Sequence, residues 1–73
     1  MARISINSEI GGTVWQVAAT VGSHLEVDDP IVVLESMKME IPVAAPAAGV
    51  LVELLVKPGE TVKEGQTVAV LET

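Results

Sequence analysis

The chain has 73 residues, of which 49% are hydrophobic and one is aromatic, and its formal net charge is −6. Its length predicts a single domain over residues 1–73, with a thin core built from Val, Ile, Leu and Ala. The four basic residues are too few for the clustered charge that binds nucleic acid or anionic membranes. The lack of cysteine excludes disulfides and thiolate metal sites.

No apolar run reaches the roughly 20 residues that span a bilayer. The first dozen residues also lack the apolar stretch of a signal peptide. We therefore expect a cytoplasmic protein without a membrane-spanning segment.

An internal repeat organises the chain. Residues 12–36 align without a gap on residues 49–73. The identical pairs are Gly12/Gly49, Gly22/Gly59, Val33/Val70, Leu34/Leu71 and Glu35/Glu72. Both glycine turns and both apolar runs coincide in this alignment, which indicates a duplication.

In chain order, the first half predicts a strand at 14–19, a turn at Gly22, a short strand, a turn at 28–30 and a strand at 31–35. Helical spacing of apolar residues is absent, and the four prolines would interrupt most helices. The second half repeats the order with a strand at 50–56, turns at 58–59 and 64–65, and a strand at 68–72.

Two similar β units in one small chain predict an all-β fold, either a sandwich or a flattened barrel, with a pseudo-twofold axis. Each half would then cover the apolar face of the other, and the pairing would hide the strand edges.

Between the halves, residues 32–43 predict a hairpin with Met37 and Lys38 as its two-residue turn. Such turns prefer Asn-Gly, Asp-Gly or other glycine-containing pairs, and neither Met nor Lys adopts positive φ readily. A local conflict of this kind is typical of functional sites, which makes Lys38 the candidate functional residue. Folding about this turn pairs Ser36 with Met39, Glu35 with Glu40, and Leu34 with Ile41.

Each of these residues also has an ordinary interpretation. A lone lysine on a turn is normally a solubilising charge, and methionines near a turn normally fill gaps in a core. Glu35 and Glu40 would then belong to a solvated face. His24, expected on a turn, has Thr61 as its repeat counterpart, and the sequence gives it no partners for hydrolytic chemistry or metal binding. Trp15 aligns with Val52, which predicts a core or half-buried packing residue.

Residues 35–40, Glu-Ser-Met-Lys-Met-Glu, resemble the attachment motif of biotinyl domains, whose centre is Met-Lys-Met. Ser36 stands where the motif usually has Ala. Residues 46–49 resemble the Pro-x-x-Gly turn of these domains, and residues 59–65 resemble their Gly-x-x-Val-x-x-Gly turn. The resemblance covers roughly residues 4–73 and is greatest to the short free-standing biotin/lipoyl attachment proteins, without the thumb insertion that some bacterial members carry.

The resemblance implies a barrel-sandwich hybrid of two antiparallel sheets, with the lysine on an exposed hairpin. It implies that Lys38 is biotinylated by a biotin protein ligase, which would supply the base that the protonated lysine lacks. The biotin arm would shuttle CO₂ between a biotin carboxylase and a carboxyltransferase, as in an acetyl-CoA carboxylase of fatty acid biosynthesis. The chain itself would be a monomeric carrier rather than an enzyme, without a metal. The recognition motif would be Glu35, Ser36, Met37, Met39 and Glu40.

Three alternatives stay open. Lipoyl domains resemble this chain but usually have Asp-Lys-Ala at the tip, where this chain has Met37 and Met39, so both positions favour biotin. The same lysine could accept either biotin or lipoate. The third alternative is an unmodified β interaction module that binds a protein partner.

Overall fold

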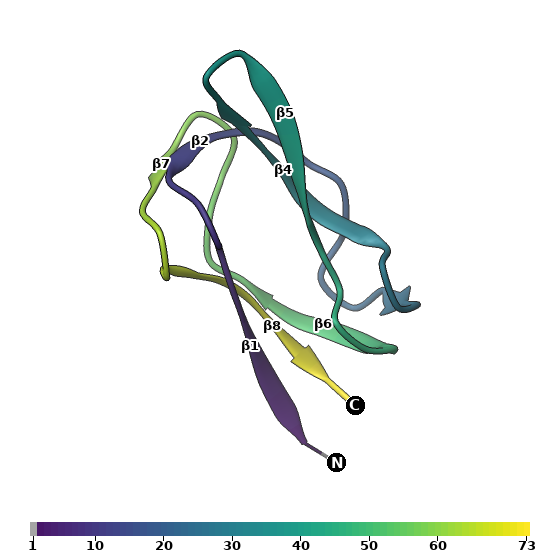
Figure 1. Ribbon diagram of the computed structural model, residues 1–73. Coiled ribbons are helices and arrows are strands. Elements are labelled where there is room, and N and C mark those ends of the chain that lie inside the picture. Colours follow the sequence, from purple (N-terminus) through teal and green to yellow (C-terminus); the bar gives the residue numbers. More distant parts are fainter. Residues whose placement is uncertain (1) are drawn as a thin grey trace.

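The computed structural model describes residues 2–73, and all of the regular secondary structure in this range consists of β-strands (Figure 1). The strands form two four-stranded antiparallel sheets, in the orders β1-β8-β6-β3 and β5-β4-β2-β7. The expected all-β fold of two antiparallel sheets is therefore confirmed. The strands are β1 (Arg3–Asn7), β2 (Gly12–Val17), β3 (His24–Leu25), β4 (Pro30–Ser36), β5 (Met39–Ala44), β6 (Gly49–Leu54), β7 (Thr61–Val62) and β8 (Thr67–Glu72).

Residues 2–73 contain no helix that is long and apolar enough to cross a membrane.

The strands expected from the sequence are all present, with boundaries that differ by no more than two residues. The strand expected at 14–19 is β2, and the strand expected at 50–56 is β6. The sequence interpretation missed β1, although its side chains alternate in the manner of a half-buried strand. Ile4 and Ile6 of β1 turn inward, whereas the residues between and beside them are exposed.

The pseudo-twofold symmetry extends to β1, which is the counterpart of β5. Ile4 pairs with Leu71 in the register in which Ile41 pairs with Leu34. The remaining pairs of β1 with β8 follow the same rule along the strand. The duplication therefore includes the first residues of the chain, which lie outside the aligned repeat.

The two halves exchange their short strands rather than forming separate sheets. β3 comes from the first half and pairs with β6, whereas β7 comes from the second half and pairs with β2. The turns that precede them make matching hydrogen bonds: the Gly22 amide donates to the Leu51 carbonyl at 2.7 Å, and the Gly59 amide donates to the Val14 carbonyl at 2.7 Å. Both glycines have φ above 90°, which is unfavourable for a residue with a Cβ. Each half is therefore hydrogen-bonded to the other through its short strand.

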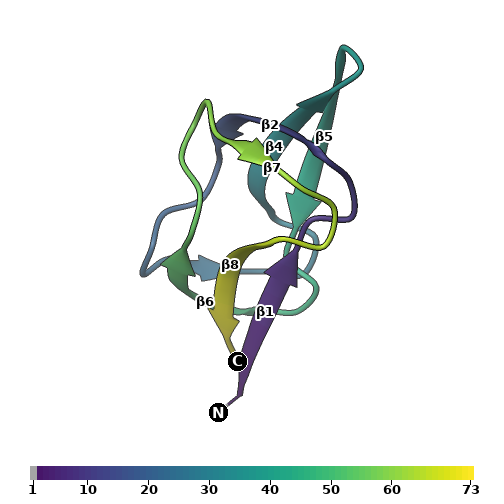
Figure 2. The same cartoon turned by 90° about the vertical axis from the view of Figure 1, so that its left-hand side faces the viewer.

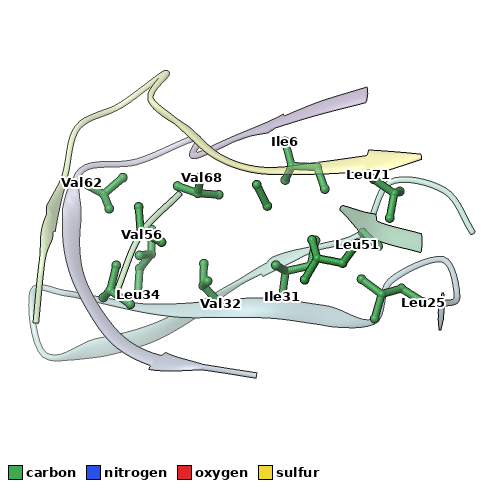
Figure 3. Packing of buried hydrophobic residues seen from close by; sticks show 13 residues of the cluster. Ile6, Leu25, Ile31, Val32, Leu34, Leu51, Val56, Val62, Val68 and Leu71 are labelled. Atoms are coloured by element: carbon green, nitrogen blue, oxygen red, sulfur yellow. The ribbon is translucent and has the colours of Figure 1, made fainter. Parts of the chain in front are cut away.

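The core lies between the sheets and consists of aliphatic side chains (Figure 3). Val68 and Leu71 on β8 point toward Ile31 and Val32 on β4. Full burial of one such side chain stabilises the fold by roughly 1.5–3 kcal/mol. The buried hydrophobic residues are Ile6, Val14, Leu25, Ile31, Val32, Leu34, Ala45, Leu51, Val56, Val62, Val68, Ala69 and Leu71.

The molecule is elongated, with Cα extents of 36 × 18 × 17 Å. The β4–β5 hairpin projects at one end, and both chain ends lie at the other (Figures 1 and 2). The Ala2 amide donates to the Thr73 carbonyl at 3.2 Å, and the Thr73 amide donates to the Ala2 carbonyl at 2.8 Å. In the repeat these two residues correspond to Met39 and Ser36, so the chain ends occupy the position that the hairpin turn occupies in the other half.

Candidate functional site: the tip of the β4–β5 hairpin

The hairpin has the register that the sequence predicts. Ser36 pairs with Met39, Glu35 with Glu40, and Leu34 with Ile41. A slip by one residue would turn the fully buried Leu34 toward solvent, so the core fixes the register. The two residues left between the strands are Met37 and Lys38, which form the turn. We call residues 35–40 the tip.

The turn has an unusual backbone for the residues that it contains. Met37 has φ 52° and Lys38 has φ 64°, so both occupy the left-handed region. Positive φ at both central positions is what a type I′ turn requires, and it matches the twist of the flanking strands. For residues with a Cβ, this conformation costs roughly 1–2 kcal/mol each. The turn therefore holds strain that an Asn-Gly pair would largely avoid.

The two side chains of the turn, and that of Met39 at the start of β5, stand in solvent. Lys38 is exposed, Met37 is 92% exposed and Met39 is 63% exposed. The interpretation of the two methionines as core gap-fillers is therefore wrong. Within residues 2–73 one ion pair is present, between Arg3 Nε and Glu72 Oε2 at 3.2 Å, so the Lys38 ammonium has no such partner there.

Glu35 and Glu40 face each other across the hairpin, and both are exposed. Like charges directly opposite each other on two strands are unfavourable. The corresponding positions in the other sheet are Glu72 and Arg3, which form the ion pair. The fold therefore accommodates opposite charges at this register, but beside Lys38 the chain has two carboxylates.

Gly12 on β2 supports the base of the tip, a role that its place in the repeat alone does not reveal. A Cβ on Gly12 would lie 2.7 Å from the Glu35 carbonyl oxygen and 3.5 Å from the Ser36 Cβ. The absence of a side chain at Gly12 thus lets β2 approach β4 where the tip begins. Gly49 has the same relation to the Glu72 carbonyl oxygen. The presence of glycine at both repeat positions was therefore the sequence signal for this close approach of strands.

His24 and Trp15 lie outside the tip. His24 is exposed and belongs to β3, where it pairs with Val50, so its expected position on a turn is wrong. Trp15 lies at the bulge of β2 and is exposed, with 50% of its surface accessible to solvent, so the expectation of a core or half-buried packing residue is wrong.

The hiding of strand edges is incomplete. A cleft of about 540 Å³ lies between β1 and β5, and its lining on the β5 side begins at Ile41, beyond the tip. Among residues 2–73, no three His, Asp or Glu side chains gather as a metal site would need. The tip itself presents the Lys38 amine to solvent, at the end of a projecting hairpin (Figure 1).

The residue pattern of the family described as "Biotin-requiring enzyme" matches residues 4–71. The chain is 36% identical over 62 residues to a biotin/lipoyl attachment protein of Bacillus subtilis, with 85% of each chain covered. It is 38% identical over 66 residues to the biotinylated protein TB7.3 homolog of Mycobacterium leprae, covering 90% of this chain and 93% of the relative.

Two further similarities are to parts of larger proteins. A probable dihydrolipoyllysine-residue succinyltransferase of Schizosaccharomyces pombe is 42% identical over 62 residues, which cover 85% of this chain and 14% of that protein. In the crystal structure of the Kluyveromyces lactis urea carboxylase, a region superposes with a TM-score of 0.94 at 35% identity. It covers 99% of this chain and 6% of the carboxylase.

Proposed function

This chain belongs to the biotin/lipoyl attachment family, and we propose that it is a biotin carboxyl carrier that bears biotin on Lys38. It is a small carrier domain like those of carboxylases and is not itself catalytic. The observation that supports Lys38 most directly is its position: it is an exposed lysine, without an ion-pair partner in residues 2–73, at the tip of a hairpin whose turn is strained.

The tip fits an attachment site because its amine is accessible and its backbone is fixed. In the proposed reaction, Lys38 Nζ attacks the carboxyl carbon of a biotinyl-adenylate held by a biotin protein ligase, the bond between that carbon and the phosphate oxygen breaks, and AMP leaves. An amide forms and one positive charge is lost. The ligase would also accept the proton, since a lysine in water is protonated at neutral pH. The role of this chain is to hold the amine at a defined place on a rigid element.

Biotin, once bound, would carry a carboxyl group between two active sites on partner proteins. We propose a biotin carboxylase and a carboxyltransferase as these partners, for example those of an acetyl-CoA carboxylase in fatty acid biosynthesis. The chain would act there as a monomeric domain, 1–73, in the cytoplasm. Tethering supports this role because it replaces diffusion of a free cofactor by a high local concentration at both active sites.

Lipoate is the second candidate cofactor. The identity with the succinyltransferase component favours it, because the name of that relative contains a dihydrolipoyllysine residue. Two observations favour biotin: Met37 and Met39 flank the lysine in place of the Asp and Ala usual in lipoyl domains, and one relative that matches over nearly its full length is named as biotinylated. An unmodified interaction module is the third candidate, and nothing at the tip favours it.

The test is the intact mass of the protein after expression with biotin, lipoate and their ligases. We expect the wild-type chain to gain one biotin, and Lys38→Arg to gain nothing while it unfolds at the same temperature. Lys57→Arg is the matched control, because it removes an exposed lysine outside the tip and should be modified like the wild type.

A full biotin adduct on Lys38→Arg would refute the assignment of the residue. If the wild type gained only a lipoyl group, lipoate would replace biotin as the proposed cofactor. If it gained neither group, the result would favour the unmodified interaction module.

A further inference from the structure

We propose that Met37 and Met39 form an oxidant-sensitive site, at which reversible conversion of the two thioethers to sulfoxides blocks modification of Lys38. This inference rests on the proposed function. It starts from the distribution of sulfur: the chain has no cysteine and three methionines, and between residues 2 and 73 all of the sulfur is at the tip. The two methionines are neighbours of Lys38, one on each side.

Both thioethers are open to a dissolved oxidant. Met37 is 92% exposed and Met39 is 63% exposed, so neither is protected by packing. Methionine in soluble domains usually fills irregular gaps in a core, and these two do not. Their exposure at the tip, whose turn already carries strain, indicates that they serve contact with another molecule rather than stability.

Within residues 2–73 the hydrophobic core contains no methionine, and this separates oxidation from unfolding. Sulfoxide formation normally damages a protein by placing a polar group in its core or in a methionine-rich interface. Here the buried residues in the range 2–73 are aliphatic apart from Ser8 and Gly49, so peroxide has no core sulfur to attack in that range. Oxidation at the tip should therefore change what the tip binds while the fold stays intact.

The oxidant is a peroxide, and the reaction balances without a further reagent. The sulfur lone pair attacks one peroxide oxygen, the O–O bond breaks, and the sulfur is oxidised by two electrons. With hydrogen peroxide, the second oxygen leaves as water after it takes up the proton of the transferred oxygen. The reverse reaction needs a methionine sulfoxide reductase and a thiol reductant.

The effect on Lys38 follows from what the modifying enzyme must enclose. A ligase that places its activated acyl group at the lysine must surround the turn, and an apolar thioether fits an apolar pocket. A sulfoxide brings a strong hydrogen-bond acceptor into that pocket, where it would be buried without a partner. We expect modification of Lys38 to slow about tenfold or more.

The test uses the unmodified full chain. Samples are treated with hydrogen peroxide, the peroxide is removed with catalase, and peptide masses identify the oxidised residues. The rate of adduct formation on Lys38 with biotin ligase is then measured by intact mass, before and after treatment with a sulfoxide reductase. Thermal unfolding of the same samples reports on the fold.

We expect sulfoxides on Met37 and Met39, an unchanged unfolding temperature, a slowed reaction and recovery after reduction. The matched variant is Met37→Leu combined with Met39→Leu, since Leu and Met have similar volumes and Leu has no sulfur. Whatever the rate of this variant, peroxide treatment should leave it unchanged.

Equal rates for the oxidised and untreated wild type would overturn the inference. So would an equal loss of rate in the leucine variant, which would assign the effect to another residue such as Trp15. If the untreated wild type gains no adduct at all, the proposed function fails, and this inference fails with it.

Discussion

Outside the tip, four positions have positive φ, and each carries a residue that suits this conformation. The two positions with positive φ in the tip do not. Gly22, Gly59 and Gly65 are glycines, and Asp28, the repeat counterpart of Gly65, is a residue type that tolerates the left-handed region. Met37 and Lys38 have the same sign of φ without either advantage. The contrast within one chain indicates that the side chains of the turn are retained for what they contact, at a cost in stability.

Replacement of Met37 by Asn should therefore stabilise the protein. Asn is favoured at the first central position of a type I′ turn, and the mostly exposed methionine loses little burial when it is removed. We expect a gain of about 1 kcal/mol, which for a domain of this size raises the unfolding temperature by roughly 4–8 °C.

The same variant should be modified more slowly at Lys38. The matched control is Asp28→Gly, which relieves positive φ elsewhere and should leave the rate of modification unchanged. Thermal unfolding and the rate of adduct formation measure the two effects. A Met37→Asn protein no more stable than the wild type would contradict the argument that the turn is strained.

The β4–β5 hairpin is the element that the sequence predicts best. Its register follows from one symmetric fold about Met37 and Lys38, and a slip by one residue would expose the buried Leu34. The contact between β2 and the base of the tip could not be predicted in the same way. It depends on how closely two strands pack, and a glycine in a sequence does not say which backbone atom lies against it.

The close approach of β2 to β4 predicts that Gly12→Ala destabilises the protein. The added methyl group would lie 2.7 Å from the Glu35 carbonyl oxygen, so β2 or the hairpin must shift. We expect a loss of roughly 1–3 kcal/mol, as for other overpacked sites, measured by chemical denaturation. The shift should also slow modification of Lys38, because Glu35 belongs to the tip.

Gly11→Ala is the control for this prediction. Its Cβ would meet the nearest atom at 3.5 Å, which is an ordinary contact, and its φ is not positive. We expect this variant to be as stable as the wild type or more stable by about 0.5 kcal/mol. Equal losses in Gly11→Ala and Gly12→Ala would show that loss of glycine flexibility, not the close approach, is responsible.

At the scale of the whole molecule, the repeat predicts the pseudo-twofold fold but not its full extent. The counterpart of β5 is β1, which precedes the first half of the aligned repeat instead of following the second half. The sequences of β1 and β5 share little beyond Ile4 and Ile41, so the alignment does not extend before residue 12. The alternation of apolar residues in β1 was a usable signal. The exchange of β3 and β7 between the halves was not, since two-residue strands leave no distinct pattern.

The symmetry predicts that a circular permutant folds. Thr73 and Ala2 are hydrogen-bonded in both directions, as the strand ends of a hairpin are, so an Asn-Gly turn should join them. With new ends between Met37 and Lys38, we expect the same two sheets and cooperative unfolding, measured by circular dichroism. A permutant opened between Val32 and Val33, inside a central strand, is the control that should not fold. If the first permutant did not fold, this would contradict the equivalence of the hairpin turn and the chain ends in the two halves.

The opposition of the chain ends and Lys38 along a 36 Å axis has a mechanical consequence. A protein joined to either terminus would act as a pivot, and rotation of the domain about that pivot would move the Lys38 amine along an arc whose radius is close to the length of the domain. A small change of angle at the pivot therefore produces a large displacement of the Lys38 amine and of any group attached to it. Under the proposed function, such a rotation would bring Lys38 to two separate catalytic centres in turn without any deformation of the domain.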